Sequence, residues 1–493
     1  MPKAIVIGAG IAAIAASLRL RSQGFDVEVY EANPYTGGKL HAITQDGYRF
    51  DLGPSLFTMP QFVEELFELF GEEVTAHFEY IQKEVICNYF WSDGTTFSAK
   101  SDKQEYVEEL CKTFDESPAR VNAFLNRNQQ KYELTAPLFL ENSLHKLKTY
   151  LNTNTLKSIA QLYKLHIFQS LDQTAKAYFN NKKTVQLVNR YATYNGSNPY
   201  KTPGIMSLIP HLEQYYGTFF PKGGMHRISQ SLYELGLRQN ISFNLNCKVR
   251  SILTDKGQAI GVMLENGEEQ KADLVVCNMD VFPTYKSLLA DHKAPKKTLA
   301  QERSSSALIF YWGIERSFPN LDLHNIFFSD NYQEEFEYLF DKKSICDDPT
   351  VYVNISSKDN PNDAPKNCEN WFVMINAPAN YNQNWDVLVQ KTRANILRKL
   401  SGILNTDIEA LIATEYILEP SGIEKNTSSY RGALYGAASN DTMAAFLRHP
   451  NFNKKIKNLY HCGGSVHPGG GIPLCMLSAK IVSDLVQHDF KTQ

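Results

Sequence analysis

Two glycines, an alanine and an acidic residue near the start of the chain have the types and spacing that bind a dinucleotide. The run Gly8-Ala9-Gly10-Ile11-Ala12-Ala13 has the pattern G-x-G-x-x-A. Gly8 permits a tight turn, Gly10 leaves room for a pyrophosphate beside the backbone, and Ala13 lets a helix pack closely on a strand. Glu31 follows at the distance at which an acid accepts hydrogen bonds from ribose hydroxyls. These residues predict a nucleotide-binding site.

The segments around this pattern are the elements that such a site needs. Residues 4–7 are apolar and predict a buried parallel strand, residues 11–24 have helical periodicity, and residues 27–31 predict a second strand that ends in the acid. The N-terminus of the helix would present free N–H groups to phosphates. A strand, a glycine turn, a helix and a second strand predict an α/β, Rossmann-like domain.

A second glycine motif follows the acid. Gly37-Gly38-Lys39 precedes Phe50-Asp51-Leu52-Gly53-Pro54-Ser55, and read alone the two runs are an ordinary turn and hairpin. Together with the first motif they resemble the flavin-dependent amine oxidase and carotenoid desaturase superfamily, in which arginine usually stands at the position of Lys39. The resemblance implies FAD as the cofactor. It also implies cofactor contacts by Gly38, Lys39, Gly53, Pro54 and Ser55.

The far end of the sequence carries the motif most specific to that superfamily. The run 466–474 reads VHPGGGIPL and is similar to the "THPGAGIPG" of carotenoid desaturases. Successive glycines let the backbone approach a planar ring, and a helix predicted to begin at Pro473 would direct its positive end toward a reduced flavin. The resemblance implies cofactor contacts by Gly464, Gly471, Ile472 and Pro473.

Two central strands complete the expected flavin domain. Residues 247–252 contain Val249, which the resemblance places against the adenine, and residues 272–280 are an apolar strand that ends near Asn278. We therefore expect a discontinuous FAD-binding domain. Its three pieces are residues 1–80, 222–295 and 445–493.

The insertions between these pieces are expected to select the substrate. Residues 81–103 and 296–444 predict a mixed sheet, with a hairpin around Ser92-Asp93-Gly94 and strands at 307–312 and 371–375. Residues 104–221 predict a helical subdomain, and basic residues outnumber acidic ones within 141–190 although the whole chain carries a formal charge of −3. We expect this basic, apolar segment to lie on an anionic membrane surface. A solvated basic face is the alternative.

One internal region sharpens the resemblance. Residues 189–200, 208–213 and 220–227 look like those of the bacterial 1-hydroxycarotenoid 3,4-desaturases (the hydroxyneurosporene type). This implies an acyclic or monocyclic C40 substrate with a hydroxyl on carbon 1, which gains a C3–C4 double bond by hydride transfer to the flavin and loss of a proton. Desaturation of phytoene is the alternative within the same family.

Candidates for the group that accepts the proton are His467, His211 and Glu213. His467 lies inside the motif that should face the flavin, and the other two are polar residues beside the apolar run Leu208-Ile209-Pro210. His226 is a further candidate. The Asp/Arg pair proposed in phytoene desaturases aligns near residues 126–129, where no acid occurs and where Arg127 or Lys131 would have to substitute. A structural role remains the alternative for each.

Other function classes remain open or are excluded by composition. An amine or porphyrinogen oxidase on the same scaffold, with flavin attached through a residue such as Cys475, is one alternative. A prenyl-lipid carrier resembling the GDP-dissociation inhibitors is another, although the retained glycine runs argue against it. The charge balance excludes a nucleic-acid binder, and without any C-x-x-C pair the cysteines predict reduced thiols and no metal site. Without a long apolar stretch, we expect a cytoplasmic protein on the inner face of the membrane.

Overall fold

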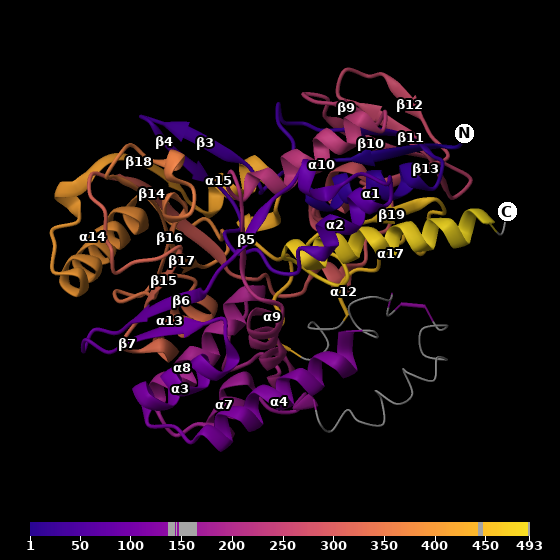
Figure 1. Cartoon of the computed structure of the whole chain (residues 1–493). Helices are drawn as coiled ribbons and strands as arrows, with labels where there is room; N and C mark the ends of the chain where they lie inside the picture. The colour runs from indigo at the N-terminus through magenta and orange to yellow at the C-terminus, as the bar shows by residue number, and fades with distance from the viewer. Residues whose placement is uncertain (137–142, 144, 147–164, 442–446, 492–493) are drawn as a thin grey trace.

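A computed structural model describes the chain except residues 137–142, 144, 147–164, 442–446 and 492–493 (Figure 1). The first of its two large sheets has five parallel strands in the order β19-β13-β1-β2-β9. Its members are β1 (Lys3–Ile7), β2 (Asp26–Tyr30), β9 (Ser242–Asn244), β13 (Leu274–Cys277) and β19 (Leu459–His461). This is the predicted Rossmann-like α/β arrangement, built from segments far apart in the sequence.

Alternating residues of β1 explain how both faces of this sheet are covered. Ala4 and Val6 pack on one side into a core with four helices, whereas Ile5 and Ile7 pack on the other side against a three-stranded sheet. The helices are α1 (Ile11–Ser22), α2 (Gln61–Glu68), α10 (His226–Arg238) and α17 (Ile472–Lys491). The small sheet contains β10 (Val249–Asp255), β11 (Gln258–Leu264) and β12 (Glu269–Lys271). The helix predicted to begin at Pro473 begins at Ile472.

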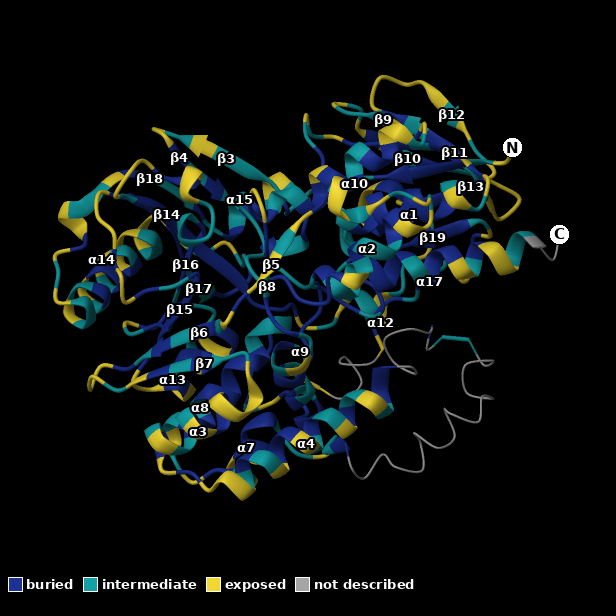
Figure 2. Cartoon of the chain, viewed as in Figure 1, coloured by how far each residue is buried: buried dark blue, intermediate teal, exposed yellow. Residues whose placement is uncertain are grey.

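The second large sheet has seven strands in the order β18-β14-β17-β16-β15-β6-β7. The predicted hairpin is confirmed, because β6 pairs antiparallel with β7, and the two predicted strands correspond to β14 and β17. The long helix α14 (Trp385–Leu404) covers one face through Ile396 and Leu400. Figure 2 shows the central strands of the sheet buried beside α14. The strands are β6 (Val85–Phe90), β7 (Thr96–Lys100), β14 (Ser306–Ile314), β15 (His324–Phe327), β16 (Val351–Ile355), β17 (Glu369–Ala377) and β18 (Ile412–Leu418).

The described part of the region expected to be helical, residues 104–221, is mainly helical, although its last three residues form the strand β8 (Phe219–Pro221). Its helices are α3 (Lys103–Phe114), α4 (Pro118–Thr135), α7 (Leu171–Tyr178), α8 (Lys182–Asn189) and α9 (Ile209–Tyr216). Two small pairings complete the fold, β3 (Ala42–Gln45) with β4 (Tyr48–Asp51) and β5 (Tyr80–Gln82) with β8 (Phe219–Pro221).

One basic residue of the segment 141–190 is not at the surface. Arg190 is 5% exposed and pairs with Glu213, so it is a buried residue rather than a surface cation. Lys176 and Lys183 are held in ion pairs with acids. Lys148, Lys157 and Lys164 lie outside the described residues. Within the described chain, no helix combines the length and apolar character required to cross a bilayer.

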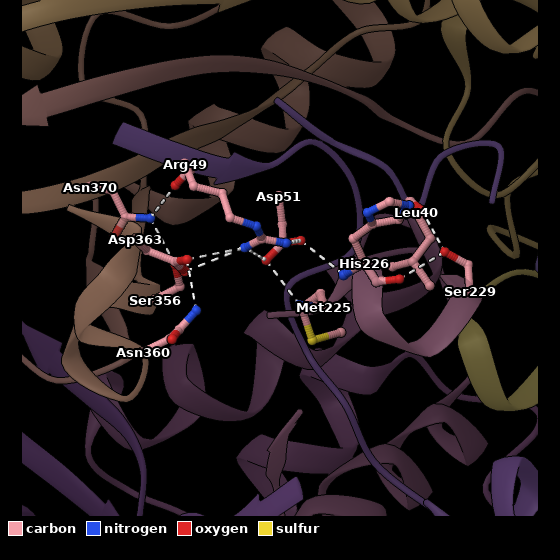
Figure 3. A network of polar contacts seen from close by, with 10 residues as sticks. All are labelled: Leu40, Arg49, Asp51, Met225, His226, Ser229, Ser356, Asn360, Asp363 and Asn370. Atoms are coloured by element: carbon pink, nitrogen blue, oxygen red, sulfur yellow. Dashed lines mark hydrogen bonds and ion pairs between the residues drawn. The ribbon is translucent and has the colours of Figure 1, made fainter. Parts of the chain in front are cut away.

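A polar network ties the two large sheets together (Figure 3). The carboxylate of Asp51 accepts the backbone N–H groups of Met225 at 2.9 Å and His226 at 2.8 Å, which are among the free donors at the start of α10. Arg49 pairs with Asp51 at 2.9 Å and reaches Asp363, in the short 3-10 helix Pro361–Asp363 before β17, at 3.3 Å. The network fixes the position of β4, and with it the Gly53-Pro54-Ser55 turn that follows.

Candidate flavin and substrate site

One cavity of about 950 Å³ begins at the carboxyl ends of the parallel strands and continues to the seven-stranded sheet. The end of an α/β strand is where such folds bind nucleotides. Residues predicted to hold a cofactor that line it are Gly8, Gly10, Glu31, Gly38, Lys39, Gly53, Pro54, Ser55, Val249, Asn278, Gly464, Gly471, Ile472 and Pro473. Ala13 is fully buried, outside the lining, in the core of α1.

The first glycine turn leaves no room for side chains. Gly8 has φ +90°, and a Cβ on Gly10 would lie 2.6 Å from Oδ1 of Asn278. The second turn packs against the first, since the N–H of Gly37 donates to the carbonyl of Ala9 at 2.8 Å. A Cβ on Gly38 would lie 3.2 Å from Cα of Gly10. Glycine therefore keeps backbone exposed to the cavity at the start of α1.

Glu31 holds this turn and still faces the cavity. Its carboxylate accepts the N–H of Ala9 at 2.7 Å and that of Asn33 at 2.8 Å. A carboxylate has about four acceptor positions, so Glu31 retains capacity for hydroxyl donors from a bound ligand.

The Lys39 and Gly53 segments interlock. The ammonium of Lys39 donates to the carbonyl of Leu434 at 2.9 Å, and burial lowers its pKa, an effect that Asp280 partly opposes. A Cβ on Gly53 would lie 1.8 Å from the carbonyl oxygen of Lys39, so this position requires glycine. Lys39 thus links the start of the chain to the loop that precedes the C-terminal motif.

The C-terminal motif faces the first glycine turn. A Cβ on Gly463 would lie 2.5 Å from Nδ2 of Asn278, the same residue that contacts Gly10. Gly471 has φ +110° with nothing within 4 Å of the position of a Cβ, so the open space belongs to the cavity. The next residue begins α17, whose first N–H groups have no partner within the helix. A flat ring and a pyrophosphate both fit this set of glycines and N–H donors.

Proteins with similar sequences and folds include flavin-dependent oxidoreductases. The "Flavin containing amine oxidoreductase" family matches residues 11–487. A 1-hydroxycarotenoid 3,4-desaturase of a Flavobacterium strain is 60% identical over 99% of each chain. A phytoene desaturase of Fusarium fujikuroi is 29% identical over 98% of this chain and 89% of its own. A solved putrescine oxidase variant has a TM-score of 0.65 and 14% identity, covering 100% of this chain and 99% of its own.

The chain belongs to the flavin-containing amine oxidoreductase family. The predicted resemblance, the flavin cofactor and the oxidoreductase class are thereby confirmed. The fold agrees over the whole chain with that of the solved putrescine oxidase variant.

Only some of the predicted acid–base residues of this flavoprotein lie on the cavity wall. His467 and Glu213 line the cavity, but His211 does not. The ring of His211 stacks on Tyr215, and burial lowers its pKa to about 4. His226 lies at the start of α10, outside the lining, and burial lowers its pKa to about 4 as well.

Glu213 is engaged by a buried polar cluster. Its carboxylate lies 3.5 Å from Arg190, accepts the hydroxyl of Tyr191 at 2.9 Å and also accepts the hydroxyl of Tyr194. The guanidinium of Arg190 lies 4.4 Å and 4.9 Å from the ring centroids of these two tyrosines. The cation and the two hydroxyl donors compensate the negative charge of the buried carboxylate, which favours a structural role for Glu213.

The two residues considered as substitutes for the missing Asp/Arg pair lie in α4. Arg127 is on the exposed side and donates to Gln130. Lys131 is 1% exposed and donates to the carbonyl of Gly204 at 3.0 Å and to Ser207 at 2.6 Å. Neither lines the cavity.

Sequence reasoning missed several polar residues on the wall formed by the seven-stranded sheet and its neighbours, among them His324, Tyr352 and Asn195. His324 and Tyr352 lie on β15 and β16, adjacent strands whose other residues are largely apolar. A polar side chain within such a strand is the signal that would have found them, because an apolar sheet buries a polar group at a cost unless it is hydrogen-bonded or used.

Proposed function

We propose that this flavoprotein is a carotenoid desaturase that introduces a C3–C4 double bond into an acyclic or monocyclic 1-hydroxycarotenoid. The observation that carries the proposal is a single cavity that combines the glycine turns with an apolar wall. That wall includes Ile86, Ile205, Leu208, Ile209, Leu212, Ile309, Ile326, Met374 and Leu418. The 60% identity to a 1-hydroxycarotenoid 3,4-desaturase supports the substrate class.

FAD fits the cavity residues on the evidence of the glycine positions. We assign its contacts to the cofactor residues predicted from the sequence, except the buried Ala13, within a domain made of residues 1–80, 222–295 and 445–493. The bound flavin supplies a two-electron acceptor for a hydride from carbon. The glycine turns orient the ring, and the N-terminus of α17 favours negative charge near it.

The apolar wall would do two things for the reaction. It would hold a rod-like polyene with one end beside the ring, and it would exclude water from the reacting carbons. Positive charge that develops as hydride leaves would be delocalised along the conjugated chain, so the wall needs no counter-ion there. A sheet domain of residues 81–103 and 296–444 would provide most of this surface.

We assign acceptance of the proton to His467. It lines the cavity within the same motif as Gly471, whereas the carboxylate of Glu213 is already engaged by Arg190 and two tyrosines. His211, which does not line the cavity, would act only on the packing of α9. Replacing His467 by Gln should therefore lower kcat while FAD stays bound.

Incubation of FAD-loaded protein with carotenoids tests the proposal. A 1-hydroxycarotenoid should show a shift of its absorption to longer wavelength as the conjugated chain lengthens, and phytoene should not change. Turnover of phytoene alone would indicate the alternative desaturase. Turnover of neither, with oxidation of amines or porphyrinogens instead, would overturn the carotenoid assignment. Flavin that stays with the denatured chain would indicate attachment through a residue such as Cys475.

We further propose that the helical subdomain, residues 104–221, lies on a membrane surface, from which so apolar a substrate would enter. Phe168 supports this, because its side chain is 93% exposed. Flotation with anionic and neutral vesicles tests the idea. Binding to anionic vesicles that weakens in Phe168→Ser supports it, and no binding to either contradicts it.

A further inference from the structure

His324 lines the cavity and has one ring nitrogen without a hydrogen-bond partner among the described residues. The residue begins β15, its side chain is 3% exposed, and it lines the cavity wall. Its Nδ1 lies 2.7 Å from the hydroxyl of Tyr352 and 3.2 Å from Nδ2 of Asn354. Its Nε2 is buried and has no hydrogen-bond partner among the described residues. A buried polar atom without a partner points to a ligand that supplies one.

The contacts of Nδ1 decide which nitrogen of His324 carries the proton. Nδ2 of Asn354 also donates to the carbonyl of Leu323 at 3.1 Å, which fixes the orientation of the amide and makes Nδ2 a donor toward the ring. Nδ1 is therefore an acceptor, and its single lone pair is shared between the amide of Asn354 and the hydroxyl of Tyr352. Burial, with a smaller effect of Lys83, lowers the pKa of His324 to about 3, so the ring is neutral. The single proton is on Nε2, which is thus a free donor.

A short chain of hydroxyls connects His324 to the expected flavin. The hydroxyl of Tyr352 is 2.8 Å from Oγ of Ser55, which belongs to the Gly53-Pro54-Ser55 turn. Because the hydroxyl of Tyr352 donates a hydrogen bond to His324, its oxygen accepts a hydrogen bond from the hydroxyl of Ser55. The N–H donor is therefore positioned from the same turn that is expected to contact the cofactor.

We propose that Nε2–H of His324 donates to the carbon-1 hydroxyl oxygen of the substrate and so selects hydroxylated carotenoids. This inference rests on the proposed function. Only three carbon–carbon bonds separate carbon 1 from carbon 4, so a group that binds the hydroxyl must lie close to the ring that accepts the hydride. A carotenoid without the hydroxyl would leave the buried N–H unpaired, which disfavours its binding.

Other polar groups of the cavity are less suited to this role. Arg190, Tyr194 and Glu213 are engaged with one another; Nε of Arg190 is a further buried donor without a partner among the described residues, but its guanidinium is held by Tyr194 and Glu213. Oδ1 of Asn195 is also buried without a partner among the described residues, but it can only accept a hydrogen bond. Asn195 is therefore the rival, and a variant of it is the matched control.

The test compares one carotenoid with and without its carbon-1 hydroxyl. For FAD-loaded wild type, His324→Phe, His324→Gln and Asn195→Ala, both kcat/KM and the Kd from carotenoid absorption changes are measured. Loss of the donor in His324→Phe should lower the preference for the hydroxylated substrate about tenfold or more. His324→Gln, which keeps an N–H donor, should retain part of the preference, and Asn195→Ala should keep it.

An unchanged preference in His324→Phe, or a loss in Asn195→Ala instead, would overturn the role of His324. If wild type turns over neither carotenoid, the proposed function fails, which is a different outcome from an unchanged preference. If the Phe variant does not take up FAD, His324→Met is measured in its place. The preference is a ratio within one protein, so a loss of folded protein does not change it.

Discussion

Single residues on the cavity wall show two uses of glycine. At Gly10 and Gly53 a side chain would collide with the protein itself, with Oδ1 of Asn278 and the carbonyl of Lys39 respectively. At Gly471 nothing of the protein is within 4 Å, so a side chain would collide only with whatever occupies the cavity. Glycine is therefore needed at Gly10 and Gly53 for the chain to fold, and at Gly471 to leave space for the ligand.

Gly471→Ala should weaken FAD binding about tenfold or more, because the added methyl group occupies space that we assign to the cofactor. Gly24→Ala is the matched control. Gly24 has φ +90°, also has nothing within 4 Å, and lies far from the cavity wall after α1. Both variants carry similar backbone strain, so equal FAD affinity, measured by fluorescence titration, would contradict the assignment.

The buried ammonium of Lys131 should make the free energy of unfolding depend on pH. Burial, and secondarily Arg127, lowers its pKa to about 7 from the ordinary 10.5. Between these values the unfolded chain binds more protons than the folded one, so stability rises with pH by up to about 1.4 kcal/mol per unit. Below pH 7 Lys131 is charged in both the folded and the unfolded chain, so the whole cost of burying its charge lowers the stability of the fold.

Urea unfolding of wild type and Lys131→Met at pH 6, 7.5 and 9 measures this effect. Relative to wild type, Lys131→Met should gain the most free energy of unfolding at pH 6, and this gain should shrink as the pH rises. Lys112→Met, at an exposed position of α3, should leave the pH dependence as it is in wild type. Identical slopes for wild type and Lys131→Met would refute the prediction.

At the scale of elements, the start of α10 depends on a residue from another part of the chain. None of its own side chains caps the helix, and Asp51 from β4 does so instead. Asp51 belongs to a motif read from the sequence as part of the flavin site. The structure gives it a different role, in which it aligns β4 and α10 so that the following Gly53-Pro54-Ser55 turn reaches the cavity.

Asp51→Ala should destabilise the fold by about 3 kcal/mol, because it removes two hydrogen bonds at a helix start and leaves Arg49 with one carboxylate fewer. Asp102→Ala is a control cap. Asp102 accepts two N–H groups at the start of α3 but is exposed and pairs with no arginine among the described residues, so its loss should cost about 1 kcal/mol. Equal losses in denaturant titrations would show that the pair with Arg49 contributes nothing.

Elements also show what the sequence could predict. The glycine turns and the strands at 307–312 and 371–375 have local patterns, and they were predicted. The contact of His324 with Tyr352 depends instead on the pairing of β15 with β16, which no local pattern specifies. The sequence alone indicates only that Arg190 is one of the basic residues of 141–190, because its partner Glu213 is on another helix and only the tertiary fold brings the two together.

At the scale of the whole molecule, the nucleotide sheet joins segments from both ends of the sequence. β19 pairs with β13, which pairs with β1, and α17 packs on α1 (Figure 1). A ligand bound between the two glycine motifs therefore contacts parts of the chain that separate when it unfolds. Binding to the folded state alone stabilises it.

FAD at a hundredfold excess over its Kd should stabilise the fold by about 2.7 kcal/mol. Thermal unfolding with and without FAD measures the shift in Tm, which should be present in wild type and Gly24→Ala. At the same FAD concentration it should be smaller in Gly471→Ala. A shift of equal size in all three proteins would place the bound flavin elsewhere.

The order of strands in the parallel sheet has a consequence for biosynthesis. A ribosome makes β1 and its glycine turn early, but β19 and the turn before α17 emerge only after the entire seven-stranded sheet has been translated. The nascent polypeptide must keep an apolar sheet edge unpaired during that interval. Cofactor capture is consequently a late event, and the incomplete chain is the form in which chaperones would be needed most.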